Sequence, residues 1–272
     1  LYYRGDADRK VTFSNYYDFQ MLDSTNAYVT STPEDKDSWH FQLDTAPDGS
    51  SGKYFDNPDY VLSSFSVMYD VWEDFSERYG LDSVDGTGLP TMLTVYLTYD
   101  DEYPENEEDF EYNAVNKGQN RDWQVMGTSI SFPGCLEHEV MAHEYTHGIN
   151  GQLTMSQYLN EPGAVMESYA DIIGDQISML EGYPECTDDN AWHLGGTYGP
   201  YMRNMAKPKE FCMPQYVGGN YYLNPIAEVI GDEFDMGGVH TNSSLLNYLA
   251  SCMVNGTGSD GAAVLTMDEC LD

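Results

Sequence analysis

The sequence predicts an α+β fold with two lobes, a β-rich N-terminal lobe at residues 1–135 and a mainly helical C-terminal lobe at residues 136–272. Two patterns carry this prediction. Segments in which apolar and polar residues alternate occur in the first part of the chain, and apolar residues recur at helical spacing from about Leu136 onward. The length of 272 residues is sufficient for one large domain or for two lobes that share a cleft.

In the N-terminal part, strands are expected at residues 11–13, 39–43 and 93–97. The last of these alternates clearly with period two. One helix is expected between them, at about Tyr60 to Tyr79, and Gly80 can end it. Its apolar residues recur at alternating steps of four and three: Val61, Phe65, Met68, Trp72 and Phe75.

The C-terminal part opens with His143-Glu144-x-x-His147, an H-E-x-x-H pattern. On an α-helix, residues four positions apart lie about 40° apart around the axis, so both imidazoles can reach one small cation. Glu144 would project beside that cation, where it could take a proton from a bound water. The pattern indicates a zinc site, and the alternative interpretation is a solvated helix face.

A second helix is expected around Glu167, which lies twenty residues after His147. Glu167 and Asp171 are four residues apart and share one face of this helix. One could bind the metal while the other accepts the spare N–H of a ligand His. The alternative is a pair of surface acids. The expected apolar stripe of the helix consists of Val165, Tyr169, Ile172, Ile173 and Ile177.

The chain is strongly acidic, with a formal charge of −35 at pH 7 and a pI near 4.1. Such a charge repels nucleic acid and anionic membranes, so neither is expected as a partner. No run approaches the roughly eighteen consecutive apolar residues that a spanning helix needs. The charge can serve solubility, or it can attract cationic peptides, and the sequence leaves both interpretations open.

Five cysteines favour an oxidising location. Proximity in the sequence favours the pairs Cys186 with Cys212 and Cys252 with Cys270, which leaves Cys135 over. All five could equally be free, because connectivity does not follow from one sequence.

The last part of the chain contains a long Gly-, Pro- and Cys-rich loop at residues 182–221. After it comes the run Asp235-Met-Gly-Gly-Val-His240-Thr-Asn-Ser243. Near the end, Thr266-x-x-Glu269 is a capping box that should open a helix.

With this run, the H-E-x-x-H pattern and the Glu167/Asp171 pair, the chain resembles the thermolysin-like zinc metallopeptidases. The resemblance extends in order from roughly Tyr54 to His240. It implies a two-lobed zincin in which the active site lies between a β-rich lobe and a helical lobe. The helical lobe is expected to lack its last helices.

The resemblance also implies a role for each matched residue. One catalytic zinc ion would be held by His143, His147 and Glu167, with Glu144 as the general base and Asp171 hydrogen-bonded to a ligand. The remaining implied roles are stabilisation of the oxyanion by Tyr158 and His240, orientation of His240 by Asp235, and binding of the substrate main chain by Asn113, Ala114 and Arg203. Val140, Leu194 and Met202 would line a pocket for a bulky hydrophobic residue, or they are ordinary core residues.

The family's double calcium site is matched poorly. Glu139 matches its first acid, but the later positions correspond to Ser178, Ala191, His193 and Gly196, which are poor ligands for a cation that prefers several oxygens. Calcium could still bind through Glu185, Asp188 and Asp189 of the same loop.

Together these features predict a secreted zinc endopeptidase that acts on peptides or proteins and cleaves before bulky hydrophobic residues. Its other expected partner is a missing C-terminal segment or a released propeptide. One alternative is an acidic surface or matrix interaction protein that keeps the peptidase fold with weak catalysis. A second is a structural zinc site. The intact Glu144 argues against the first, because a binding module needs no general base, and a structural site favours four ligands rather than three.

Overall fold

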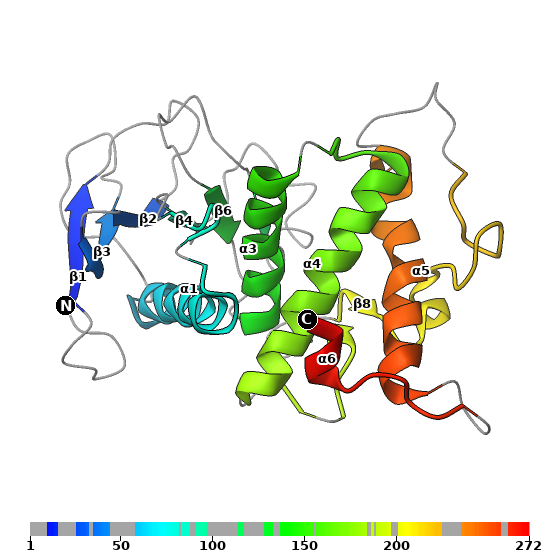
Figure 1. Ribbon diagram of the computed structural model, residues 1–272. Helices are drawn as coiled ribbons and strands as arrows, with labels where there is room; N and C mark the ends of the chain where they lie inside the picture. Colours follow the sequence, from blue (N-terminus) through cyan, green and yellow to red (C-terminus); the bar gives the residue numbers. More distant parts are fainter. Residues whose placement is uncertain are drawn as a thin grey trace. The chain divides into compact units, whose positions relative to one another are not determined.

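The computed structural model describes residues 10–15, 26–32, 35–43, 58–81, 83–87, 91–96, 114–116, 128–132, 137–154, 156–183, 186–187, 189–196, 201–224, 235–256 and 261–271. The chain divides into two compact units, residues 1–136 and 137–272. The first contains strands β1–β6 and helix α1, and the second contains helices α3–α6 with a small hairpin (Figure 1).

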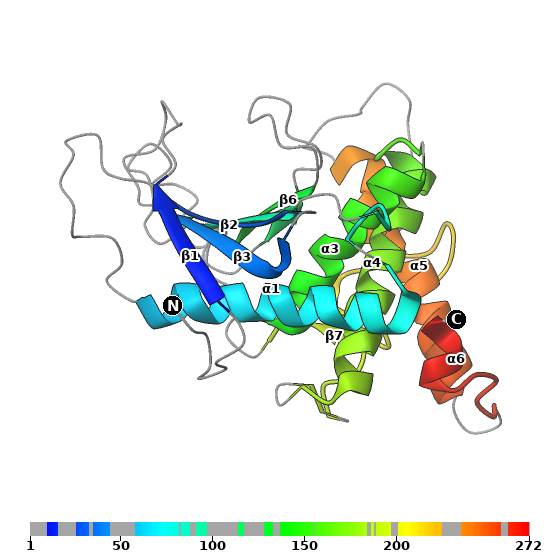
Figure 2. The ribbon, with the colours of Figure 1, turned by 60° about the vertical axis from the view of Figure 1, so that its left-hand side comes forward.

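The first unit contains a six-stranded mixed sheet with the strand order β1-β3-β2-β4-β6-β5 (Figure 2). β2 pairs antiparallel with both β3 and β4, whereas β1 pairs parallel with β3 and β4 pairs parallel with β6. The strands are β1 (Lys10–Asn15), β2 (Asn26–Thr32), β3 (Asp35–Leu43), β4 (Thr91–Tyr96), β5 (Val115–Asn116) and β6 (Thr128–Phe132). The strands expected at residues 11–13 and 39–43 lie within β1 and β3, and residues 93–96 lie within β4. Leu97 lies outside the described residues.

Helix α1 (Pro58–Tyr79) confirms the helix predicted at about Tyr60 to Tyr79. It contacts β4 and lies across one face of the sheet (Figure 2). Met68 and Phe75 of the expected apolar face are buried. Gly80 ends the helix with a φ of +66°, and its N–H donates to the carbonyl of Ser76. The side chains of Val61 and Phe65 lie outside the described residues.

The second unit is built from three long helices, α3 (His138–Leu153), α4 (Asn160–Glu181) and α5 (Asp235–Asn255). α4 packs against both α3 and α5 and lies between them (Figure 1). The short helix α6 (Met267–Leu271) contacts α4 and α5. The helical character predicted for the C-terminal part is therefore confirmed. None of the helices that the structure describes has the length and hydropathy needed to cross a bilayer.

The loop predicted at residues 182–221 contains regular elements that the sequence pattern did not indicate. β7 (His193–Leu194) pairs antiparallel with β8 (Arg203–Asn204), and the 3-10 helix η2 spans Pro208–Phe211. Trp192 and Met205, next to the two strands, are buried in one cluster with Ala250 of α5. This packing fixes the hairpin on the helices and thereby fixes the position of Arg203.

The capping box at the start of α6 is confirmed. The N–H of Thr266 donates to Oε2 of Glu269 at 2.8 Å, and the N–H of Glu269 donates to Oγ1 of Thr266 at 3.1 Å. These two bonds satisfy donors that the first helical turn leaves without partners.

The disulfide pairings expected from proximity are wrong for the described cysteines, because Cys186 is not bonded to Cys212 and Cys252 is not bonded to Cys270. The members of each expected pair lie in different surroundings. The thiol of Cys186 donates to Oε2 of Glu139 at 3.1 Å, whereas Cys212 is exposed. Cys270 packs on the Trp192 cluster. Cys135 lies outside the described residues.

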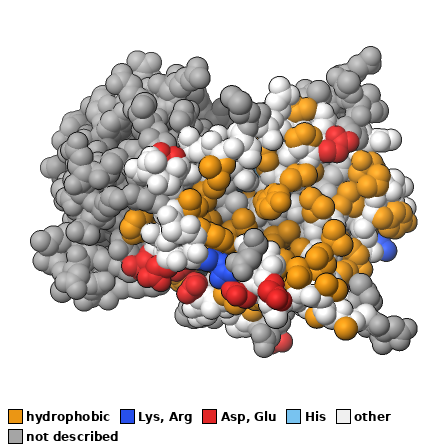
Figure 3. Space-filling model, in the orientation of Figure 1, with side chains coloured by type: hydrophobic (Ala, Val, Ile, Leu, Met, Phe, Trp, Pro, Cys, Tyr) orange, Lys and Arg blue, Asp and Glu red, His pale blue; other side chains and the backbone are white. Residues whose placement is uncertain are grey.

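Helix α4 buries a different face from the one that its apolar residues indicated. Val165 and Tyr169 of the expected stripe are 38% and 56% exposed, whereas Ile177 is buried. Figure 3 shows hydrophobic side chains exposed on the surface of this unit. The buried face of α4 is made largely of small and polar residues, among them Gly163, Ala164, Glu167, Ser168, Asp171 and Gly174. Small side chains allow α3 and α5 to approach closely, so that polar groups from all three helices meet.

Gly174 is the point at which α3 and α4 approach most tightly through backbone atoms. A Cβ at this position would lie 2.6 Å from the carbonyl oxygen of Glu139 and 3.0 Å from the backbone nitrogen of His143. We expect Gly174→Ala to lower the free energy of unfolding by about 1–3 kcal/mol, because backbone atoms of α3 must move. Denaturant unfolding measures this change.

The matched control is Gly151→Ala, in α3. No atom lies within 4 Å of a Cβ added at Gly151, so this variant should gain about 0.5–1 kcal/mol from helix propensity. Equal stability changes in the two variants would contradict the close approach at Gly174.

Candidate metal centre

Three side chains from α3 and α4 bring nitrogen and oxygen atoms to one point. His143 and His147 lie one turn apart on α3, and their Nε2 atoms are 3.0 Å apart. Oε1 of Glu167, on α4, lies 3.1 Å from Nε2 of His147, and Oε2 lies 3.6 Å from Nε2 of His143. Ligand atoms of the three residues all lie within 4.8 Å of one another. His143 and Glu167 are buried, so the alternative interpretations of a solvated helix face and of surface acids are wrong.

The three residues fit a zinc ion in both chemistry and surroundings. Two imidazole nitrogens and one carboxylate form a ligand set typical of catalytic zinc, which leaves one position open for water or substrate. Within the described part of the chain, the buried Oε2 atom of Glu167 accepts no hydrogen bond. A buried carboxylate oxygen without a donor is costly unless a cation satisfies it, and a metal ion among these atoms would do so.

The electrostatics of Glu167 keep it ionised. Burial would raise its pKa, but the hydrogen bond with His147 and the charges of His143, His240 and Arg203 hold the pKa of Glu167 well below its ordinary value. Conversely, burial would lower the pKa of His147, and the bond to Glu167 raises it overall. The surroundings therefore keep the Glu167 carboxylate negative and favour positive charge beside it, and a bound cation would supply such a charge.

Asp171 lies one turn after Glu167 and contacts a ligand. Its Oδ1 atom is 3.0 Å from Nδ1 of His143, the imidazole nitrogen that faces away from the other two ligands. Such a contact fixes the orientation of a metal-binding imidazole. Burial would raise the pKa of Asp171, but the charge of Arg203 and the contact with His143 lower it overall. Asp171 is thus an ionised acceptor beside His143.

Arg203, on β8, lies against the two carboxylates of α4. Its Nε atom is 3.1 Å from Oδ1 of Asp171, and one terminal nitrogen is 3.6 Å from Oε2 of Glu167. Burial would lower the pKa of Arg203, and the charges of Asp171 and Glu167 raise it overall. The guanidinium is therefore held at the metal centre by the small hairpin.

Tyr158 and His240 meet at Oε1 of Glu167. The Tyr158 hydroxyl donates a short hydrogen bond to Oε1 and lies 3.1 Å from Nε2 of His240, which is itself 3.4 Å from Oε1. Burial and the negative charge of Glu167 raise the pKa of Tyr158, so the phenol keeps its proton. The His240 side chain is 48% exposed, so these two groups line the side of the cluster that solvent reaches.

A left-handed turn at the start of α5 directs Asp235 onto His240. Asp235, Met236, Gly237 and Gly238 all have positive φ values. The turn returns the Asp235 carboxylate to the helix, where Oδ1 lies 2.5 Å from Nδ1 of His240 and Oδ2 accepts from Thr241 at 2.9 Å. Strained backbone of this kind persists where surrounding contacts hold it. The φ of +86° favours glycine at position 237, and a Cβ there would also require the side chain of Asn160 to shift.

The Asp235 contact also sets the charge state of the His240 imidazole. Burial would lower the pKa of His240, but the hydrogen bond to Asp235 and the charge of Glu167 raise it overall. His240 is thereby favoured as a hydrogen-bond donor toward the centre of the cluster.

Glu144 follows His143 on α3 and is 7% exposed. Its charge contributes to the raised pKa values of His147 and Tyr158, which places it within electrostatic range of the metal centre. It is not one of the three residues whose atoms form the ligand cluster. Its role as general base stays a prediction.

The residues expected to bind the substrate main chain are described only in part. Asn113 lies outside the described residues, and Ala114 is buried in the first unit. Val140 and Leu194, expected in a hydrophobic pocket, are each 1% exposed, which fits the alternative core interpretation, and Met202 is half-buried. The roles of these residues stay predictions.

A separate group of buried acids lies at the start of α3, where the resemblance had placed Glu139 in a calcium site. Oε1 of Glu139 accepts from the N–H of Gly195 at 2.8 Å, and both oxygens of Asp175 accept from the N–H of Trp192. Burial raises the pKa of Glu139 to about 9 and that of Asp175 to about 8. Ser178, at another calcium position, lies 2.6 Å from Nδ1 of His138. A calcium ion at Glu139 would therefore have to displace a proton.

We expect these two acids to make the folded chain less stable as the pH rises. When unfolded they titrate near 4.5 and 3.8, whereas folding holds their protons up to about 9 and 8. Between these limits the folded state binds more protons, so each acid lowers the free energy of unfolding by up to about 1.4 kcal/mol per pH unit. Denaturant unfolding across this pH range measures the slope. Glu139→Gln and Asp175→Asn should flatten it, and an unchanged slope in both variants would disprove the assignment.

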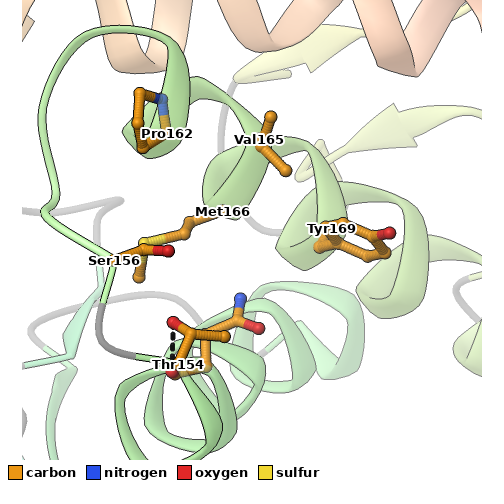
Figure 4. Close-up of a pocket in the computed structure, with 7 residues that line it drawn as sticks. Thr154, Ser156, Pro162, Val165, Met166 and Tyr169 are labelled. Atoms are coloured by element: carbon orange, nitrogen blue, oxygen red, sulfur yellow. Dashed lines mark hydrogen bonds between the residues drawn. The ribbon is translucent and has the colours of Figure 1, made fainter.

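A cavity of about 370 Å³ lies where the end of α3, the following loop and the start of α4 meet (Figure 4). Asn150 and Thr154 of α3 and Val165 and Tyr169 of α4 are among the residues that line it. Val165 and Tyr169 lie roughly opposite Glu167 around the axis of α4. The cavity is therefore separate from the metal centre.

The helical part of the chain matches a known protein family. The family model described as thermolysin metallopeptidase, alpha-helical domain, matches residues 155–269. The matched segment contains Tyr158, Glu167, Asp171, Arg203 and His240, which meet at the metal centre from the loop before α4, from α4 and α5, and from the hairpin. This match supports a thermolysin-like metallopeptidase.

Several curated relatives of this thermolysin-like chain are metalloproteases. A zinc metalloproteinase of Renibacterium salmoninarum is 34% identical over 133 residues, which are 48% of this chain and 24% of that protein. The neutral protease NprE of Bacillus pumilus is 35% identical over 183 residues, which are 66% of this chain and 53% of that protein. The chain spans less than two thirds of the length of three curated relatives that it matches, with shares of 24%, 60% and 34%.

A solved structure has a similar fold. The precursor of protealysin, a metalloproteinase from Serratia proteamaculans, gives a TM-score of 0.50 at 19% identity, over 92% of this chain and 69% of that one. At this identity the similarity concerns the fold.

Two polar residues at the metal centre of this thermolysin-like chain were not singled out from the sequence. Ser168 and Asn247 hydrogen-bond to each other, and Asn247 also bonds Asp171. A signal for Asn247 was available, because it lies seven residues after His240 and therefore on the same face of the helix. Ser168 carries no comparable signal, since a serine next to a ligand more often faces solvent.

Proposed function

We propose that this thermolysin-like chain is part of a zinc-dependent endopeptidase. The observation that carries the proposal is the convergence of His143, His147 and Glu167, whose ligand atoms lie within 4.8 Å of one another, with the buried Glu144 within electrostatic range. Three protein ligands with a further acid beside them are typical of hydrolytic zinc sites, not of structural ones.

Each residue would perform one step of peptide hydrolysis. Zinc, when bound, would polarise the scissile carbonyl and lower the pKa of a water molecule. Glu144 would accept the proton of the attacking water and later deliver it to the leaving amine. The Tyr158 hydroxyl and His240, which lie 3.1 Å apart, would donate to the oxyanion as its charge develops. Asp235 would hold His240 in the required orientation through its contact with Nδ1.

Substrate binding is proposed for Arg203 together with Asn113 and Ala114. Arg203 is well suited, because its guanidinium is buried, charged and fixed by two carboxylates. A rigid donor of this kind can hold a substrate carbonyl without losing further conformational freedom. Cleavage before bulky hydrophobic residues is proposed through Val140, Leu194 and Met202.

We propose an extracellular location, because relatives are named extracellular metalloprotease and extracellular elastase. The formal charge of −35 favours a cationic peptide as substrate, with an attraction that added salt would screen. A propeptide is a proposed partner, since the protein with the similar fold is a precursor.

The test of the proposed function is zinc content and peptidase activity on one sample, before and after chelation. One equivalent of zinc, with cleavage of a casein-like substrate abolished by the chelator and restored by zinc, would support it. Zinc binding without cleavage in a chain that includes any further helical part would favour the alternative of an acidic interaction protein that keeps the peptidase fold. A chain that binds no zinc would refute the metal centre.

A further inference from the structure

Asp171 divides its two carboxylate oxygens between different partners. Oδ1 lies 3.0 Å from Nδ1 of His143 and 3.1 Å from Nε of Arg203. Oδ2 accepts a hydrogen bond of 2.7 Å from Nδ2 of Asn247. Because Asp171 is completely buried, its second oxygen depends on a protein donor and not on bulk water.

Asn247 lies on α5, and its side-chain amide is engaged at both ends. It is 1% exposed, and its Oδ1 atom accepts a hydrogen bond of 2.7 Å from the hydroxyl of Ser168. An ionised carboxylate can only accept hydrogen bonds, so the nitrogen of the amide must face Asp171. The hydroxyl of Ser168 then holds the opposite end. The orientation of the amide is therefore determined by its two partners on α4.

We propose that Asn247 is a positioning residue for the metal site. By holding Oδ2, it fixes the carboxylate of Asp171 in the orientation in which Oδ1 faces His143. That contact in turn fixes the orientation and tautomer of the ligand imidazole. The inference rests on the proposed zinc site and adds a residue from a third helix to it.

The same hydrogen bond places His240. Asn247 follows His240 by seven residues, which is about two turns, so both side chains lie on the same face of α5. The bond from Asn247 to Asp171 fixes this face against α4 at one point, and His240 contacts Tyr158 and Glu167 two turns earlier. A buried amide that served stability alone would have no effect on the metal or on His240.

The test compares zinc binding in Asn247→Leu, which keeps the approximate size of the side chain, with Ser251→Ala. Ser251 is a buried residue of α5 one turn further on, and its hydroxyl donates to the carbonyl of Tyr248 in the same helix. Zinc affinity is measured by competition with a chelator, and coordination is followed by the visible spectrum of the cobalt-substituted protein. Both are measured at a temperature at which circular dichroism shows every variant folded.

We expect Asn247→Leu to bind zinc about 10–100-fold more weakly, with an altered cobalt spectrum, because a contact to a ligand's partner is lost. Ser251→Ala should match the wild type in both measurements. Should Asn247→Leu fail to fold, Ser168→Ala takes its place. It removes only the bond that orients the amide, and it should weaken zinc binding less.

Equal zinc affinity and equal cobalt spectra in the Asn247 or Ser168 variant and the Ser251 control would overturn the inference. A wild-type chain that binds zinc but cleaves no peptide would contradict the proposed endopeptidase and leave the comparison of affinities valid. An active wild type with unchanged affinity in Asn247→Leu would contradict the inference alone. A wild type without zinc affinity would overturn both.

Discussion

Replacement of Glu144 by Gln is expected to lower kcat/KM for peptide hydrolysis by at least about 10²–10⁴-fold, the usual contribution of general acid–base catalysis. Gln has nearly the same shape as Glu but cannot accept a proton from the attacking water. Because Glu144 is not one of the three residues that form the ligand cluster, zinc should remain bound. The measurement is steady-state hydrolysis together with the zinc content of the same preparation.

The control for this substitution is Glu161→Gln. Glu161 lies in the first turn of α4 and is exposed. Its replacement by Gln therefore removes the same negative charge as Glu144→Gln, but outside the metal centre. It should retain wild-type activity. Full activity in Glu144→Gln would show that Glu144 is not the general base. Loss of zinc from Glu144→Gln would show instead that this residue acts as a ligand.

Replacement of Glu167 by Gln is expected to weaken zinc binding further than any other single change on α4. Glu167 is fully buried and provides the negative charge of the ligand set, and Gln provides only a neutral carbonyl oxygen. The loss should exceed the roughly 10–100-fold that follows when a residue bonded to a ligand is removed. Chelator competition measures this loss, and activity should fall with zinc content.

Asp171→Asn provides the comparison. The Asp171 carboxylate contacts His143 without belonging to the ligand cluster. The zinc affinity of Asp171→Asn should therefore fall about 10–100-fold and lie between the affinities of Glu167→Gln and the wild type. If Glu167→Gln bound zinc as tightly as Asp171→Asn, then Glu167 would not be a ligand.

The helices of this chain could be predicted well from local pattern. Helix α1 was predicted from apolar spacing and its terminal glycine, and α6 from a capping box, because each signal depends on residues within a few turns. The face that α4 buries could not be predicted in this way. Its apolar residues Val165 and Tyr169 are exposed, whereas Glu167 and Asp171 are buried. Burial of acids becomes favourable only when partners from other elements surround them.

For the candidate site too, local spacing along the chain was informative, whereas contacts between distant segments could not be predicted. The spacing of His143 and His147, and that of Glu167 and Asp171, is a property of helix geometry, so the sequence indicated which side chains could share a cation. The disulfide pairs, by contrast, were inferred from separation along the chain and were wrong for the described cysteines. Separation along the chain does not report distance in the folded state.

By itself, the sequence determined the helical second part, the candidate ligand residues and the family resemblance, because these depend on short spacings along the chain. Only the tertiary structure decided that Arg203 from a short hairpin and Asn247 from α5 both bind Asp171. Only the tertiary structure revealed that Glu139 and Asp175 are buried, which raises the pKa of both carboxyl groups. These features depend on which groups face one another across helices, and on the high free energy of an unpaired charge away from water.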